Sequence, residues 1–396
     1  MSEETPVLPF AHEQLAQRTV FGVGRLDTVK DEGRRLGASR VLVIAAEPEA
    51  ELGGRLRELL GPLAVDTWSQ VRQHVPSELA DAAARHAAEL DVDLLVTVGG
   101  GSTTGLGKAI SRRTHTALLA VPTTYAGSEK TPIWGETAEA RKTTGRDPFV
   151  LPRTVIYDPL LTLTLPAHIS GTSGMNALAH CVEAVYAADA NPITTQHAVM
   201  AVRALSTALP RVVTDPGDVA ARSEALYGSM LAGLVLATAG ISLHHHVCHV
   251  LGGMFDLPHA DLHTVVLPHA VAAVQAGRPD ALAPLAAALG TSYLPQALYS
   301  LSQTMHLPDA LAPLGMSDAD ISSAVPRCVE STAVDVVALT DASATTLLRA
   351  AVHGGPPRGA PADPLTTAMP SWPDSEGLGV AGYASAAERL RQGIGG

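Results

Sequence analysis

A glycine-rich turn between an apolar segment and a helical pattern constrains the fold of this chain most. Residues 94–98 (LLVTV) are followed at once by Gly99-Gly100-Gly101, and the segment continues through Lys108 into a helical pattern. Such glycines let the backbone approach a pyrophosphate, and the N–H groups at a helix start favour its charge. The turn therefore predicts a dinucleotide site, although Thr104 replaces the third glycine of the strict pattern, so a plain strand-to-helix turn remains the alternative.

A second polar loop follows the next expected strand. Residues 122–129 (PTTYAGSE) supply hydroxyl groups and another glycine at the carboxyl end of the expected sheet, where α/β proteins bind ligands. The two loops together predict a dinucleotide cofactor. The expected cofactor-binding residues are Gly99, Gly100, Gly101, Ser102, Thr103, Thr123, Thr124 and Ser128.

The first part of the chain alternates short β-type runs with amphipathic helical patterns, which is typical of a parallel α/β sheet. The expected strands are residues 40–45, 64–68, 94–98, 117–121 and 154–157. Ser77 is expected to cap the helix that follows it. After about residue 170, long Ala- and Leu-rich segments predict helices only.

The predicted fold is thus an N-terminal α/β dinucleotide-binding domain, residues 1–165, followed by an all-helical catalytic domain, residues 166–354. Residues 355–396 are rich in Pro, Gly and Ala without periodicity, and we expect a poorly ordered tail.

Composition restricts the partners. The formal charge of -12, from 27 basic and 39 acidic residues, argues against a nucleic-acid partner. Three widely spaced cysteines and an acidic N-terminus without an apolar core predict a cytoplasmic protein. The apolar run 230–243 is too short for a membrane span and is expected to be a buried core helix. A homodimer is expected as the commonest soluble assembly.

Histidines occur at helical spacing in two segments. Asn176 and His180 are four residues apart, as are His245 and His249, so each pair shares one helix face. His259 follows shortly afterwards. Imidazoles in this pattern suit a divalent metal such as Zn or Fe, whereas ordinary hydrogen-bonded histidines are the alternative. The histidines assigned to that ordinary role are His115, His197, His263 and His269.

Taken in order, the strings GGGST, VPTTYAGSE, NALAHCVEA, HHHVCHVLGG and LPHA resemble the iron-containing alcohol dehydrogenase superfamily over roughly residues 18 to 353. GSEKTPIWG, RKTTGRDP, VLPRTVIYDP and TSGMNALAHCVEA resemble its maleylacetate reductase branch. The resemblance implies the dehydroquinate synthase-like fold of two domains with the active site between them. It also implies NADH or NADPH as the cofactor and NAD(P)H-dependent reduction of the C=C bond of maleylacetate to 3-oxoadipate, a step in the catabolism of aromatic compounds.

The resemblance places a metal, if one is present, on His180, His245 and His259, with Asn176 where the superfamily has aspartate. A neutral amide removes one ligand charge, so we expect that Fe or Zn is not required. His249 matches a proton-relay histidine of the family and is expected to be the general acid, with His245 and His180 as polarising donors.

A dicarboxylate-like substrate also needs cations, and the candidates are Lys130, Arg141, Lys142 and Arg146. Ordinary solvated charge is the alternative for this cluster. Lys130 and His246 depart from the branch pattern, which leaves open another enone, a carbonyl acid, or a small alcohol or aldehyde as substrate. A catalytically silent cofactor-binding protein is disfavoured because the polar cleft residues are retained.

Overall fold

A parallel sheet forms the core of the N-terminal part of the computed structural model, which describes residues 9–138 and 141–357, without the side chains of residues 141 and 142. Residues 358–396 of the predicted tail lie outside this description. The sheet order is β1-β8-β5-β4-β2-β3, and every neighbouring pair is parallel. The strands are β1 (Arg18–Phe21), β2 (Val41–Ala45), β3 (Ala64–Trp68), β4 (Leu94–Gly99), β5 (Ala117–Pro122) and β8 (Thr154–Tyr157).

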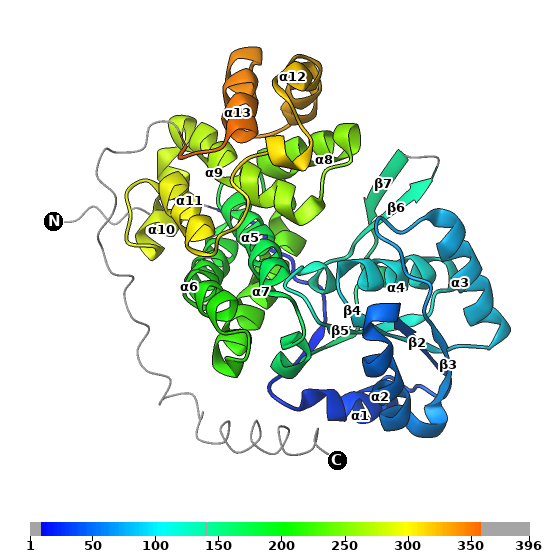
Figure 1. Cartoon of the computed structure of the whole chain (residues 1–396). Coiled ribbons are helices and arrows are strands. Elements are labelled where there is room, and N and C mark those ends of the chain that lie inside the picture. The colour runs from blue at the N-terminus through cyan, green and yellow to red at the C-terminus, as the bar shows by residue number, and fades with distance from the viewer. Residues whose placement is uncertain (1–8, 139–140, 358–396) are drawn as a thin grey trace. The chain divides into compact units, whose positions relative to one another are not determined.

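Helices cover both faces of this sheet (Figure 1). Along β2, Val41 and Val43 face the core beneath α1 (Val29–Arg35) and α2 (Ala50–Leu60), whereas Leu42 faces the opposite core. That second core lies beneath α3 (Ser77–Glu89) and α4 (Gly101–Thr114). A strand buried on both faces reads as a continuous apolar run, which is why β2, β4, β5 and β8 were predicted correctly; β3, at the sheet edge and only partly buried, was predicted as well.

Three strands were not predicted. β1 is short and pairs with β8, far along the chain, so no local pattern marks it. The others form an antiparallel hairpin of β6 (Ile133–Ala138) and β7 (Arg141–Arg146). The Ser77 prediction was wrong: Pro76 is the N-cap of α3, and the hydroxyl of Ser77 lies 3.4 Å from Oε2 of Glu136 instead.

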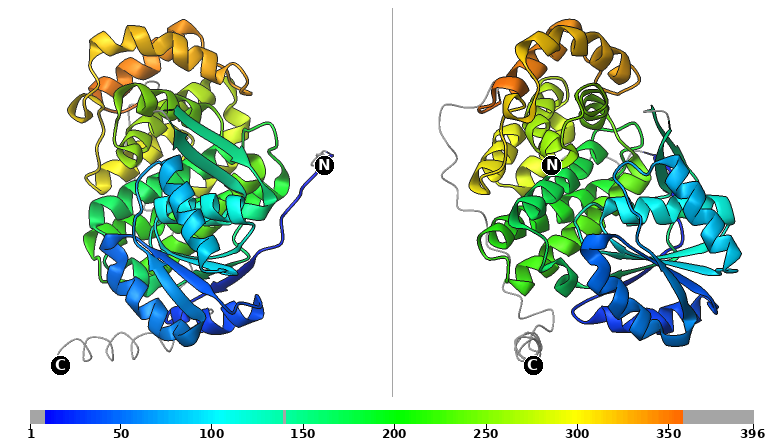
Figure 2. Two further views of the ribbon diagram at one scale, coloured as in Figure 1. Left: turned by 90° about the vertical axis from the view of Figure 1, so that its right-hand side faces the viewer. Right: turned by 45° about the vertical axis from the view of Figure 1, so that its right-hand side comes forward.

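The rest of the described chain is helical, as predicted (Figure 2). Its helices are α5 (Ala167–Ala184), α6 (Pro192–Thr214), α7 (Val219–Ala239), α8 (Leu243–Phe255), α9 (His259–Gly277), α10 (Pro279–Ala288), α11 (Leu294–Thr304), α12 (Asp318–Thr332) and α13 (Asp341–His353). α5 is buried almost all round between residues 170 and 184 and packs against α6, α7, α8 and α9. Polar side chains on α5 are therefore enclosed by protein.

The prediction of one core helix over residues 230–243 was wrong, because α7 ends at Ala239 and α8 begins at Leu243 after Gly240 adopts φ +75°. In the described residues no single helix is long and apolar enough to cross a membrane. The bent pair α7 and α8 passes that test only by length and composition.

Candidate active site

The glycine turn lies at the carboxyl end of β4, as predicted. Gly99 has φ +148°, a conformation that side chains rarely adopt, and α4 begins directly at Gly101. The N-cap residue of α4 is Gly100, which has no side chain to cap the first N–H groups of the helix. Together these features present backbone N–H groups and the positive end of the helix dipole at the sheet edge, an arrangement that suits a phosphate.

The second loop lies directly beside the first. The N–H of Thr123 donates to the carbonyl of Gly99 at 3.1 Å. A Cβ on Gly100 would lie 3.0 Å from the methyl group of Thr124, so the loops approach as closely as glycine allows. The hydroxyl of Ser128 is buried without a hydrogen-bond partner among the described residues. The structure therefore brings the predicted cofactor residues of both loops together.

Lys108 holds the second loop in place, a role that the sequence did not reveal. Its ammonium group is fully buried and donates to the carbonyls of Ser128 at 2.6 Å, Thr131 at 2.8 Å and Ile133 at 2.8 Å. Burial lowers the pKa of Lys108 to about 7, and Glu129 opposes that shift. The ammonium group of Lys108, a residue of α4, thus bonds three carbonyls, and it ties the second loop and the residues after it to the helix that follows the glycine turn.

The predicted histidines meet within the helical part. His180 on α5 stacks on His245 of α8, with ring centroids 4.7 Å apart and an interplanar angle of 17°. The ring of His249 lies 6.1 Å from that of His245, and its side chain is exposed. Asn176 lies one turn before His180, and its side-chain oxygen is buried without a partner among the described residues. The structure therefore assembles the predicted catalytic group.

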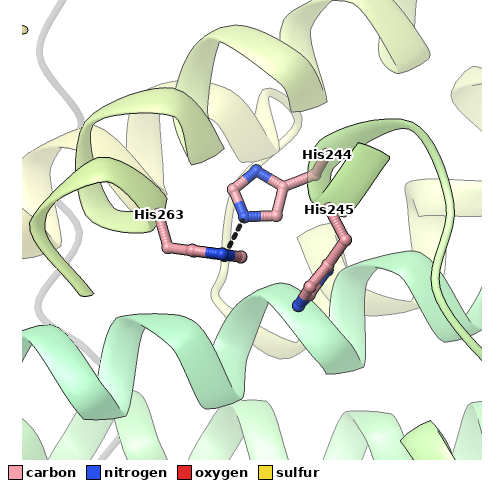
Figure 3. Close-up of side chains that lie close together, drawn as sticks. All are labelled: His244, His245 and His263. Atoms are coloured by element: carbon pink, nitrogen blue, oxygen red, sulfur yellow. Dashed lines mark hydrogen bonds between the residues drawn. The ribbon is translucent and has the colours of Figure 1, made fainter. Parts of the chain in front are cut away.

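Two further histidines belong to this cluster. His263 on α9 was assigned an ordinary role, but its ring lies 4.3 Å from that of His259 and 4.7 Å from that of His245. Its Nδ1 is 3.0 Å from Nε2 of His244. Figure 3 shows His244, His245 and His263 side by side, and one nitrogen of each lies within 4.8 Å of the others. His263 is buried and hydrogen-bonded, which fits the ordinary role assigned to it, and it also lies against the predicted histidines.

A buried carboxylate, that of Glu183 on α5, contacts the cluster. Its Oε1 accepts from the backbone N–H of His245 at 2.9 Å, and its Oε2 lies 2.5 Å from Nδ1 of the same residue. The Glu183 side chain is fully buried, and burial raises the pKa of its carboxyl group to about 8. Sequence reasoning missed Glu183, because only the packing of α8 on α5 brings the two groups together.

Burial controls the charge of the cluster. It lowers the pKa of His180 well below its ordinary value, and the neighbouring His245 and His259 add to this effect. The pKa values of His244 and His263 are also lowered well below the usual range, by burial first and then by the surrounding imidazoles. These three rings are therefore neutral at neutral pH, and each can donate one ring N–H.

Two of the candidate cations line a cavity. Lys130 and Arg146 line a cavity of about 830 Å³ with His12 and residues of α7, and none of the clustered histidines is among its described lining residues. Lys130 is buried, bonds the hydroxyl of Thr19 and lies over the ring of Tyr157. Lys142 pairs with Thr137 through its backbone, and its side chain lies outside the described part. The structure thus places Lys130 and Arg146 in a cavity whose described lining includes none of the clustered histidines.

Two segments of the chain match, in order, the two parts of one protein family. Residues 16–159 match the iron-containing alcohol dehydrogenases, and residues 170–352 match the C-terminal part of the Fe-containing alcohol dehydrogenase family. The maleylacetate reductase of Sphingobium indicum is 46% identical over 350 residues, which make up 88% of this chain and 99% of that protein.

Solved structures agree with this match. The crystal structure of maleylacetate reductase from Rhizobium sp. strain MTP-10005 is 44% identical and covers 88% of this chain and 99% of its own, with a TM-score of 0.84. The maleylacetate reductase from Agrobacterium tumefaciens is 43% identical with the same TM-score, over 88% of this chain and 100% of its own. The chain therefore belongs to the iron-containing alcohol dehydrogenase family, as an oxidoreductase of the maleylacetate reductase type.

Proposed function

We propose that this protein reduces the C=C bond of maleylacetate with NADH or NADPH and releases 3-oxoadipate. The observation that carries the proposal is a histidine cluster that includes a neutral amide, Asn176, in a chain 43–46% identical to maleylacetate reductases. In this substrate the double bond is conjugated to a ketone. Reduction therefore develops negative charge on an enolate oxygen, which hydrogen-bond donors stabilise.

The two loops would hold the cofactor. When bound, the reduced nicotinamide supplies the hydride for the conjugate addition. The N–H groups at the start of α4 and the dipole of that helix would bind the pyrophosphate, with Gly99, Gly100, Gly101, Ser102 and Thr103 on one side. Thr123, Thr124 and Ser128 would approach from the second loop, which Lys108 holds against the first.

The histidines would handle charge and protons. Donors from His180 and His245 would stabilise the enolate oxygen, because both rings lie in the buried cluster. His249 would deliver the proton that completes the reduction at the enolate carbon. Its exposed side chain supports this role, since a spent proton donor must be reprotonated from solvent.

The donor set differs from that of the superfamily, because Asn176 supplies a neutral amide where a carboxylate is usual. Among the described residues, the nitrogens that lie close enough to share an ion are those of His244, His245 and His263, within 4.8 Å of one another. One nitrogen each of His244 and His263 is already used in their mutual bond. We therefore propose that hydrogen bonds from the chain carry the reaction and that Fe or Zn is not required.

The cytoplasmic location, the homodimer and the domain limits at residues 165 and 354 stay predictions. So does the assignment of Lys130, Lys142 and Arg146 to the substrate carboxylates.

The deciding experiment follows oxidation of NADH, and separately of NADPH, at the nicotinamide absorbance with freshly generated maleylacetate, before and after exhaustive chelation. Rapid turnover that survives chelation is the expected result. Activity that is lost on chelation and restored by Zn or Fe would contradict the metal-free reaction. Activity confined to simple aldehydes would instead contradict maleylacetate as the substrate.

A further inference from the structure

The contact between Glu183 and His245 uses both oxygens of one buried carboxylate on a single residue. Oε1 accepts from the backbone N–H of His245 at 2.9 Å, and Oε2 lies 2.5 Å from Nδ1 of its ring. The exposed fractions of the two side chains are 0% and 5%. Burial opposes ionisation of this carboxyl group, so Glu183 and the imidazole share the proton that lies between Oε2 and Nδ1, and the other ring proton stays on Nε2.

These contacts leave the ring of His245 little freedom. The backbone contact holds the first turn of α8 against α5, and the Nδ1 contact fixes rotation of the imidazole within that turn. His180 packs on the ring with centroids 4.7 Å apart, and His263 packs on it at the same separation but at 61°. Because Nδ1 bonds Glu183, the other nitrogen, Nε2, lies on the far side of the ring.

We propose that Glu183 is a positioning residue of the reaction: it orients His245 so that Nε2 addresses the enolate oxygen. This inference rests on the proposed function, which makes His245 a donor to that oxygen. Carboxylates that bond the second nitrogen of a functional histidine hold its tautomer and ring orientation in many enzymes. Glu183 itself does not touch the substrate, so it acts only through His245.

A purely structural role would be to anchor α8, and two isosteric variants separate the roles. Glu183→Gln keeps the size of the side chain and an oxygen for the backbone N–H, but its amide cannot exchange a proton with Nδ1 of His245. Asp335→Asn is the matched control. The Asp335 side chain is 5% exposed against 0% for Glu183, and it bonds Nδ1 of His246, the next residue on the same helix, at 2.8 Å. General loosening of α8 would affect both variants.

We expect Glu183→Gln to lower kcat by about 10- to 100-fold with KM and the NADH dissociation constant unchanged. Asp335→Asn should keep kcat within about twofold of the wild-type value, even if its Tm falls by as much as that of Glu183→Gln. Equal losses of kcat in the two variants, or an undiminished kcat in Glu183→Gln, would overturn the proposal. Should Glu183→Gln fail to fold, Glu183→Asp replaces it, because the shorter carboxylate cannot reach both partners; a folded Glu183→Asp enzyme with full kcat would overturn it equally.

A double-mutant cycle with His245→Ala completes the test. If Glu183 acts through His245, adding Glu183→Gln to His245→Ala should reduce kcat no further. A further loss of 10-fold or more would show that Glu183 acts by another route. Failure of the proposed function looks different: His245→Ala would then turn over maleylacetate at the wild-type rate. If His245→Ala lowers kcat and Glu183→Gln does not, only the role of Glu183 is refuted.

Discussion

The imidazole of His180 lies face to face with that of His245, with ring centroids 4.7 Å apart. This stack joins the central helix α5 to α8, and it places two donors next to each other in a buried site. A pair of donors at one oxygen is the arrangement that stabilises a developing enolate.

Removal of one ring from this stack should impair the chemical step. We expect His180→Ala to lower kcat for maleylacetate by about 100-fold, the usual cost of one oxyanion donor, with little change in NADH affinity. Steady-state kinetics and a fluorescence titration with NADH measure the two effects. The matched control is His197→Ala on α6, a half-buried histidine outside the cluster. Similar losses of kcat in both variants would contradict the role of His180.

A side chain at Gly100 should weaken cofactor binding. Ala at position 100 would bring a methyl group 3.0 Å from Thr124 and separate the two loops, so we expect Gly100→Ala to raise the NADH dissociation constant by about 10-fold. Gly54→Ala is the control, because Gly54 lies inside α2 with open space at its Cβ position. That variant should be more stable by about 1 kcal/mol and bind NADH normally. Unchanged binding by Gly100→Ala would place the cofactor elsewhere.

His269 should make the stability depend on pH. Burial lowers its pKa from 6.5 to about 4, with Asp309 opposing. Between pH 4 and 6.5, His269 is therefore protonated in the unfolded chain but not in the folded chain. Its contribution to the free energy of unfolding is present above pH 6.5 and is lost as pH falls towards 4. The loss amounts to about 3 kcal/mol. Urea unfolding at pH 7.5 and 5 should show a smaller decrease for His269→Leu than for the wild type, and an equal decrease would refute the assignment.

Arg146 provides the test of substrate-carboxylate binding. Its side chain is exposed, lines the cavity and bonds the carbonyl of Ala237. If the cavity receives a carboxylate, Arg146→Gln should raise KM for maleylacetate by about 10-fold with kcat retained, since the contact exists before and during the reaction. Arg55→Gln removes an exposed arginine paired with Asp27 and should leave KM unchanged. An unchanged KM in Arg146→Gln would show that other groups bind the carboxylates.

Local patterns were sufficient to predict most of this fold. The strands buried on both faces and the glycine turn were identified because their signals lie within a few residues. β1 was missed because its partner β8 is remote, and Ser77 was misassigned because Pro76 takes the capping position. Apolar composition alone could not locate the break between α7 and α8, which depends on the positive φ of Gly240.

The candidate site was predicted in part. The i, i+4 spacing identified His245 and His249, and the same rule applied to His259 would have added His263. Glu183 is different in kind. Although it lies one turn after His180, nothing local indicates that its carboxylate turns to α8, since that contact exists only when the two helices pack. Roles that depend on tertiary contacts can be assigned only from the three-dimensional structure.

The pairing of β1 with β8 also bears on the order of events at the ribosome. β1 has a single neighbour in the sheet, and that strand ends at Tyr157. During synthesis, residues 18–21 must therefore wait until well over a hundred later residues have emerged before their backbone groups find a partner. At about 5–20 residues per second the delay lasts several seconds or longer, and a nascent chain would carry its first strand undocked throughout.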